Sequence, residues 1–74
     1  MVERRETHML VHHSIDRLPE GYRTVLLLRD IEGMSTQEVA TLVDKSPAAV
    51  RIILHRARAA LKKLLEPMFD EARQ

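Results

Sequence analysis

The spacing of apolar residues along the chain predicts four helical segments and no strand. In the first segment, from about Glu3 to Arg17, four residues follow the i, i+3, i+4, i+7 spacing of a buried helix face. They are Val11, Ser14, Ile15 and Leu18.

The second segment begins with Pro19 as its first helical residue, where the missing N–H has no helical partner in any case. It ends at Gly33, a residue typical of left-handed helix caps. Its apolar positions are Tyr22, Val25, Leu26, Leu28 and Ile31.

The third helix is predicted from a capping box. Ser35 and Glu38 stand three residues apart, so Ser35 caps a helix that runs to about Val43. A helix of about eight residues is too short to be stable alone, so packing must hold it. We expect three of its residues to face inward, namely Val39, Ala40 and Leu42.

The fourth helix has a strong start signal. After a tight turn at Asp44–Lys45, Ser46 is a good N-cap and Pro47 suits the first helical position. We expect this helix to continue until Pro67 stops it.

A short helix, a brief turn and a longer helix with a basic face form the helix-turn-helix pattern, which we place at residues 36–55. The predicted fold is all-α, a four-helix domain that spans residues 1–67. Residues 68–74 are predicted to form a frayed tail.

The fourth helix has two contrasting faces when its residues are placed at about 100° intervals. The apolar stripe, which we assign to the core, holds Val50, Leu54, Ala57, Leu61, Leu64 and Leu65. The outward face holds Ala48, Arg51, Ile52, His55, Arg56, Arg58, Ala59, Lys62 and Lys63. In a helix-turn-helix, the N-terminal half of such a face reaches base edges and the other half lies along the phosphates.

The net charge of +1 conceals an uneven distribution of charge along the chain. Residues 1–44 carry a net charge of −3 and residues 64–74 a net charge of −2, whereas residues 45–63 hold six cations and no acid. A basic block confined to one helix is typical of nucleic-acid binding. A solvated basic face is the alternative interpretation.

Composition excludes some classes of protein. The chain has 74 residues and no cysteine, so neither a disulfide framework nor a thiolate metal site is available. It shows no signal-peptide pattern and no apolar run long enough to span a membrane. We therefore expect a cytoplasmic protein without membrane contact.

Arg51 is the best candidate for a contact near the floor of a groove, and His55 and Arg56 flank it one turn later. Ile52 lies in the middle of this polar face and has three interpretations. It can sit against thymine methyl groups, belong to a protein-binding patch, or be an ordinary exposed side chain.

Residues 8–65 resemble region 4 of the sigma-70 family, and most closely its extracytoplasmic-function (ECF) group. The resemblance rests on an L-P pair, an R-x-V-x-x-L-R segment, an E-G-x-S-x-x-E-V-A link and an R-A-R-x-x-L ending. The matching residues are Leu18–Pro19, Arg23, Val25, Leu28–Arg29, Glu32–Gly33, Ser35, Glu38–Val39–Ala40, Val50–Arg51, Leu54, Arg56–Ala57–Arg58 and Leu61.

This resemblance implies an all-helical domain that binds the −35 promoter element with its fourth helix in the major groove. It also implies docking on the flap of the RNA polymerase β subunit and masking by an anti-sigma factor, all in the bacterial cytoplasm. Ser35 and Thr36 would bond phosphates at the start of the third helix. The other candidate DNA contacts are Lys45, Ser46, Ala48, Ala49, Arg51, Ile52, His55, Arg56, Arg58 and Lys62.

The sequence departs from the family pattern at two places. Ala48–Ala49 replaces a small or hydroxyl-bearing pair, and Ile52–Ile53 replaces Ser-Arg. The second change removes one cation, which implies one phosphate contact fewer or a preference for thymine. Because 74 residues leave no room for the family's region 2, we expect an excised domain or a stand-alone region 4 protein.

Three alternatives of other classes remain. A LuxR-type output domain shares the helix-turn-helix but places a histidine three residues after its valine, whereas His55 lies five after Val50. A sigma-like decoy would bind an anti-sigma factor without DNA. A metal site would use His8 and His12, which stand i, i+4. We prefer a histidine pair that is solvated or contacts a partner, and we expect no cofactor. Because the sequence shows no catalytic constellation, we also expect that the protein is not an enzyme.

Overall fold

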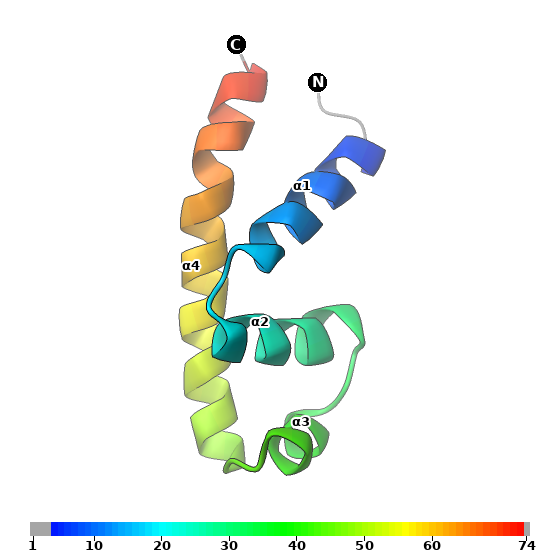
Figure 1. Cartoon of the computed structure of the whole chain (residues 1–74), viewed down its shortest axis with the longest axis vertical. Helices are drawn as coiled ribbons and strands as arrows, with labels where there is room; N and C mark the ends of the chain where they lie inside the picture. Colours follow the sequence, from blue (N-terminus) through cyan, green and yellow to red (C-terminus); the bar gives the residue numbers. More distant parts are fainter. Residues whose placement is uncertain (1–3, 74) are drawn as a thin grey trace.

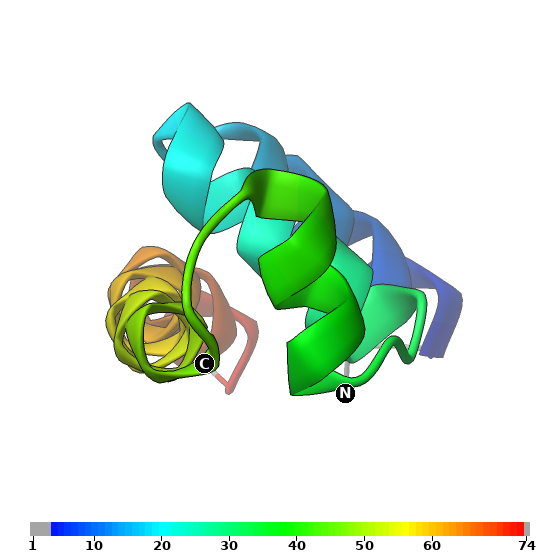
Figure 2. The same ribbon diagram turned by 90° about the horizontal axis from the view of Figure 1, so that it is seen from below.

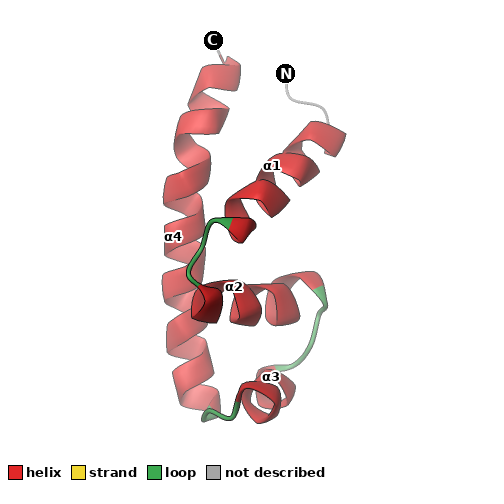
Figure 3. Cartoon of the chain, in the orientation of Figure 1, coloured by secondary structure: helices red, strands yellow, loops and turns green. Residues whose placement is uncertain are grey.

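The computed structural model describes residues 4–73, with side chains described for residues 4–68. Every regular element in that part of the chain is helical, and none is a strand, which confirms the predicted all-α class (Figure 3). The predicted start of the first helix at Glu3 lies outside the described residues. The elements are α1 (Arg4–Asp16), α2 (Glu20–Leu26), η1 (Leu27–Ile31), α3 (Thr36–Val43) and α4 (Pro47–Arg73).

The long helix α4 sets the shape of the molecule. Its 27 residues give a rod of about 40 Å, close to the longest dimension of the molecule, 43 Å. The other helices lie along one side of it, with α3 beside its N-terminus and α1 beside its later turns (Figure 1). The view along α4 shows α2 and α3 on the same side of the rod (Figure 2). The opposite side of α4 is therefore left open.

The core forms where the apolar faces of α1, α2 and α3 meet α4. Its buried apolar residues are Ile15, Leu18, Val25, Leu26, Val39, Ala40, Val50, Leu54 and Ala57. The first three members of the predicted α4 stripe are thereby confirmed, and Leu61 and Leu64 pack at the edge of the core, partly buried. Ala57 is fully buried, and its small side chain lets α4 pack closely against its neighbours.

The second helical segment begins one residue later than predicted and contains an irregular turn. Pro19 is the N-cap of α2 rather than its first helical residue. From Leu27 to Ile31 the chain forms a π-helix, in which the Glu32 N–H donates to the Leu27 carbonyl at 2.9 Å. A π turn holds one residue more than an α turn, so the side chains after it are rotated. Ile31, one of the apolar positions of this segment, does not face the core, and its side chain is 44% exposed.

Gly33 ends this segment as predicted, with a φ of +74° that a residue without a side chain adopts without strain. The helix α3 has the predicted capping box and the predicted end at Val43. Val39 and Ala40 are buried, but Leu42 is 63% exposed, so the prediction that it faces inward is wrong. An eight-residue helix supported from one side has room for only a narrow buried stripe.

The prediction that Pro67 stops the fourth helix is wrong, because α4 continues through Pro67 to Arg73. A proline inside a helix removes one backbone hydrogen bond, but contacts with neighbouring elements can hold the helix together. Beyond Pro67, the Met68 sulfur accepts a hydrogen bond from Ser14 of α1 at 3.9 Å. The division of the chain at residue 67 stays a prediction.

Candidate nucleic-acid interface

The start of α3 presents a hydroxyl group held by its capping box. The Ser35 hydroxyl oxygen accepts from the Glu38 N–H at 3.1 Å, and the Ser35 N–H donates to the Glu38 carboxylate at 3.0 Å. The backbone N–H of Ser35 is the main reason why the pKa of Glu38 lies below its usual value. Because the Ser35 oxygen is the acceptor in the cap, its hydroxyl hydrogen remains available to a phosphate. Ser35 is exposed and Thr36 half-buried.

A short turn fixes α4 relative to α3. Asp44 adopts a left-handed conformation with a φ of +56°, and the Lys45 N–H donates to the Ala40 carbonyl at 3.0 Å. The predicted cap of α4 is confirmed, since the Ala49 N–H donates to the Ser46 hydroxyl oxygen at 3.0 Å. The helix therefore begins at a defined residue with Lys45 and Ser46 exposed beside it.

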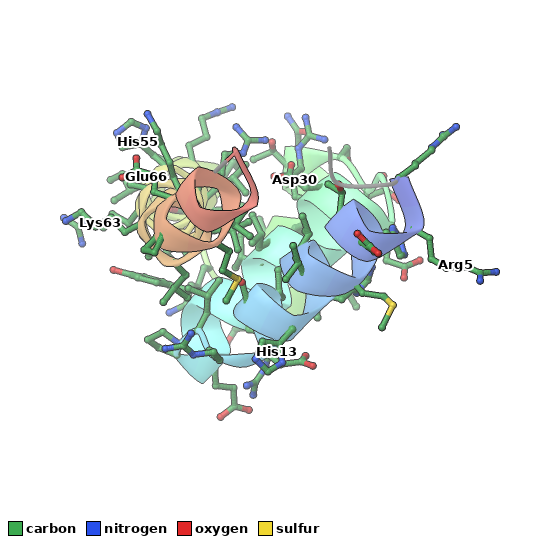
Figure 4. The ribbon with its side chains drawn as sticks, turned by 90° about the horizontal axis from the view of Figure 1, so that it is seen from above. Arg5, His13, Asp30, His55, Lys63 and Glu66 are labelled. Atoms are coloured by element: carbon green, nitrogen blue, oxygen red, sulfur yellow. The ribbon has the colours of Figure 1, made fainter. Side chains whose placement is uncertain are left out.

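The outward face of α4 is open, as predicted. Arg51, His55 and Arg56 are exposed, and Ile52 is 53% exposed among them. On the opposite side of the same turns, Val50 and Leu54 are buried in the core. His55 and Lys63 point away from α1 (Figure 4). The predicted contacts are thus brought to one surface, on which Lys45, Ser46, Ala48, Arg51, Ile52, His55, Arg56, Arg58 and Lys62 are exposed and Ala49 is half-buried.

Arg58 differs from the other predicted contacts because it already has an anionic partner. Its Nε donates to Asp30 Oδ2 at 2.9 Å, and its Nη2 donates to Asp30 Oδ1 at 2.6 Å. These hydrogen bonds hold the pKa of Asp30 below its usual value and raise that of Arg58. The two residues are 28 positions apart, so no local pattern in the sequence indicates the pair. Sequence reasoning missed Asp30, which joins this surface through its pair with Arg58.

Two of the three histidines of α1 lie side by side, with the ring centroids of His8 and His12 separated by 4.4 Å. Among the described residues, no group of three or more His, Cys, Asp or Glu side chains converges in a way that could hold a metal ion.

The helices of the described part are also too short or too polar to cross a membrane.

Comparison with known proteins agrees with the helix-turn-helix geometry. A family model described as sigma-70, region 4, matches residues 8–61 of the chain. The chain belongs to the sigma-70 region 4 family. This region 4 match covers α3, the turn and the exposed first turns of α4. The match therefore decides for sigma-70 region 4 over the alternative of a LuxR-type output domain.

The region 4 chain is also similar to sigma factors of known name. It is 42% identical to the RNA polymerase sigma-H factor of Pseudomonas aeruginosa over 69 residues, which cover 93% of the chain and 36% of that protein. It is 33% identical to the ECF RNA polymerase sigma-E factors of Salmonella typhimurium and Escherichia coli over 63 residues, which cover 85% of the chain and 33% of each protein. The chain therefore spans about a third of the length of the curated relatives it matches.

Proposed function

We propose that the chain recognises the −35 promoter element as the region 4 domain of an ECF sigma factor, and so directs transcription initiation. The observation that carries this proposal is the open basic face at the start of α4, where Arg51, Ile52 and His55 are exposed together. In a helix-turn-helix, these turns are the ones that enter the major groove.

The capped starts of α3 and α4 supply the backbone contacts of the proposed complex. Free N–H groups and the positive end of the helix dipole favour a phosphate at each helix start. Ser35 and Thr36 at the start of α3 would hold one phosphate, and Lys45 and Ser46 would hold a second beside α4. Such contacts position the protein on the duplex but carry no sequence information.

Sequence information would come from the exposed first turns of α4. Arg51 can form two hydrogen bonds with guanine O6 and N7. Ile52, at 53% exposure, offers a methyl surface to thymine, where an exposed apolar side chain loses contact with water. Lys62 lies three turns further along the helix and would meet phosphates rather than bases.

The proposal is tested by measuring binding to two duplexes of equal length, one with a −35-like element and one with its bases shuffled. We expect tighter binding to the first, and a logarithmic affinity that falls with the logarithm of salt by about 0.9 per phosphate neutralised. Fluorescence anisotropy at four salt concentrations gives both quantities. An affinity that depends on neither sequence nor salt would contradict the proposal.

We also propose the partners that family membership suggests, namely the flap of the RNA polymerase β subunit and an anti-sigma factor in the bacterial cytoplasm. No enzymatic step is part of this function. The exposed Ile52 favours a second candidate function, a sigma-like decoy that binds an anti-sigma factor only. The duplex measurement separates the two functions, because a decoy would show no sequence-dependent binding.

A further inference from the structure

Arg58 and Arg51 project from nearly the same side of α4. Seven residues separate them, which corresponds to about 10 Å along the helix and about 20° around it. A duplex that receives Arg51 in its groove therefore brings phosphates towards Arg58. By position alone, Arg58 would be expected to bind the DNA backbone.

The contacts of Arg58 argue against that role. Its guanidinium donates to both carboxylate oxygens of Asp30, at 2.9 and 2.6 Å. A bidentate pair of this kind fixes the orientation of the planar guanidinium. The pair is accessible to solvent, since the Arg58 side chain is 54% exposed and that of Asp30 is 30% exposed. A phosphate that approaches Arg58 must also approach the Asp30 carboxylate. Because the pair has no net charge, its attraction for the phosphate is weak.

The position of Asp30 adds a second reason. It lies in η1, the π-helical segment, and a π turn inside a helix often occurs at a functional position. Glu32, the residue that caps the C-terminal end of this segment, is exposed, and no ion pair involves it among the described residues. Asp30, which has an ion-pair partner, and Glu32, which has none among the described residues, therefore lie two positions apart. A variant of Glu32 can thus serve as a matched control for a variant of Asp30.

We propose that Asp30 withholds Arg58 from the phosphate backbone, and so keeps the affinity of this chain for any duplex below the value that its cations would otherwise give. This inference rests on the proposed DNA-binding function. Asp30 acts through Arg58 and is a positioning residue. Asn at this position keeps a similar shape but removes the charge that holds the guanidinium.

The test compares the salt dependence of duplex binding for the wild-type chain, Asp30→Asn, and the double variant Asp30→Asn with Arg58→Ala. We expect Asp30→Asn to steepen the slope by about 0.9 and to raise affinity for the shuffled duplex roughly five- to tenfold at 0.1 M salt. The double variant should return to the wild-type slope, because the released cation is gone and the net charge equals that of the wild type.

Glu32→Gln is the control, since it removes one negative charge from the cap of the same segment without releasing an arginine. We expect a much smaller change in its slope than in that of Asp30→Asn. Circular dichroism establishes that each variant is folded, and Asp30→Ser takes the place of Asp30→Asn if that variant loses its helices. A merely structural pair would change the melting temperature but not the slope.

Three results would overturn the inference. Equal slopes for the wild type and Asp30→Asn would mean that Arg58 gains no phosphate when it is released. A double variant with a slope shallower than the wild type would mean that Arg58 already binds DNA. A wild-type chain that binds neither duplex would overturn the proposed function and this inference together, whereas the first two results leave the proposed function intact.

Discussion

The first half of α4, residues 47–58, and its second half, residues 59–73, are held by the rest of the molecule in different ways. In the first half, Val50 and Ala57 are fully buried, and the start of the helix is fixed by the Ser46 cap. In the second half, Leu61 and Leu64 are only partly buried, and α1 diverges from the helix (Figure 1). The half that carries the candidate base contacts is therefore the half that the core positions.

This difference relates packing to recognition. Base contacts require side chains held close to their productive positions, and a helix packed on α2 and α3 supplies that restraint. The second half of α4 contributes phosphate contacts at most, and these tolerate small displacements because the charge interaction has little directionality. The molecule thus concentrates its buried surface beneath the face that we propose to read bases.

The largest effect is expected from removing a buried side chain beneath the first half. Leu54→Ala should lower the free energy of unfolding by about 2–5 kcal/mol, because it leaves a cavity in the core. Leu65→Ala should lower the free energy of unfolding by clearly less, because Leu65 lies in the second half and its side chain is only partly buried. Urea unfolding followed by circular dichroism measures both values. Equal losses would show that the two halves are held alike.

The next effect concerns DNA affinity rather than stability. Arg51→Ala should weaken binding to the −35-like duplex by about 1–3 kcal/mol and relax sequence preference, if Arg51 contacts a base. Lys62→Ala, in the second half of α4, should weaken binding equally for both duplexes and reduce the salt slope by about 1. If Arg51→Ala binds the −35-like duplex as tightly as the wild type, Arg51 does not contact a base.

A smaller effect is expected at the start of α3, which packs against the first half of α4. Ser35→Ala removes the acceptor of the Glu38 N–H and should cost about 1 kcal/mol of stability. Ser35→Gly is the matched control, because glycine at an N-cap costs only about a few tenths of a kcal/mol. Thermal unfolding gives both values. A glycine variant as unstable as the alanine variant would argue against the cap as the cause.

Those parts of the fold that depend on local chemistry could be predicted from the sequence. The Ser35–Glu38 box, the left-handed Gly33 and the Ser46–Pro47 start each involve residues within a few positions of one another. The continuation of α4 through Pro67 could not be predicted in this way. Proline is a local stop signal, and whether the helix resumes depends on packing between elements that are distant in the sequence.

The same distinction applies to the candidate site. The exposure of Arg51 and Ile52 follows from helical periodicity once the core stripe is known. The partner of Arg58 does not, because Asp30 is 28 residues away and reaches α4 only through the packing of η1. The exposed Leu42 and Ile31 illustrate the same limit, since a short helix and a π turn alter which apolar residues face the core.

The smallest expected effect is a pH dependence carried by Asp30, whose pKa Arg58 lowers mainly through a hydrogen bond. A carboxyl group with a lowered pKa in the folded state contributes stability above its unfolded pKa. That contribution is lost as the pH falls through the folded pKa. Because the pair lies at the surface, we expect it to contribute at most about 1 kcal/mol at pH 7.

This pH dependence sharpens the comparison because the pair ties η1 to the first half of α4 and to no part of the second. Asp30→Asn should therefore be less stable than the wild type at neutral pH. The gap should begin to close below about pH 4, the usual carboxyl pKa, and should disappear as the pH falls through the lowered pKa of folded Asp30. Glu32→Gln should show no comparable gap. Urea unfolding of the three chains between pH 7 and pH 2 measures it. A gap that persists at pH 2 would mean that the Asp30 carboxylate stabilises the fold by something other than its charge.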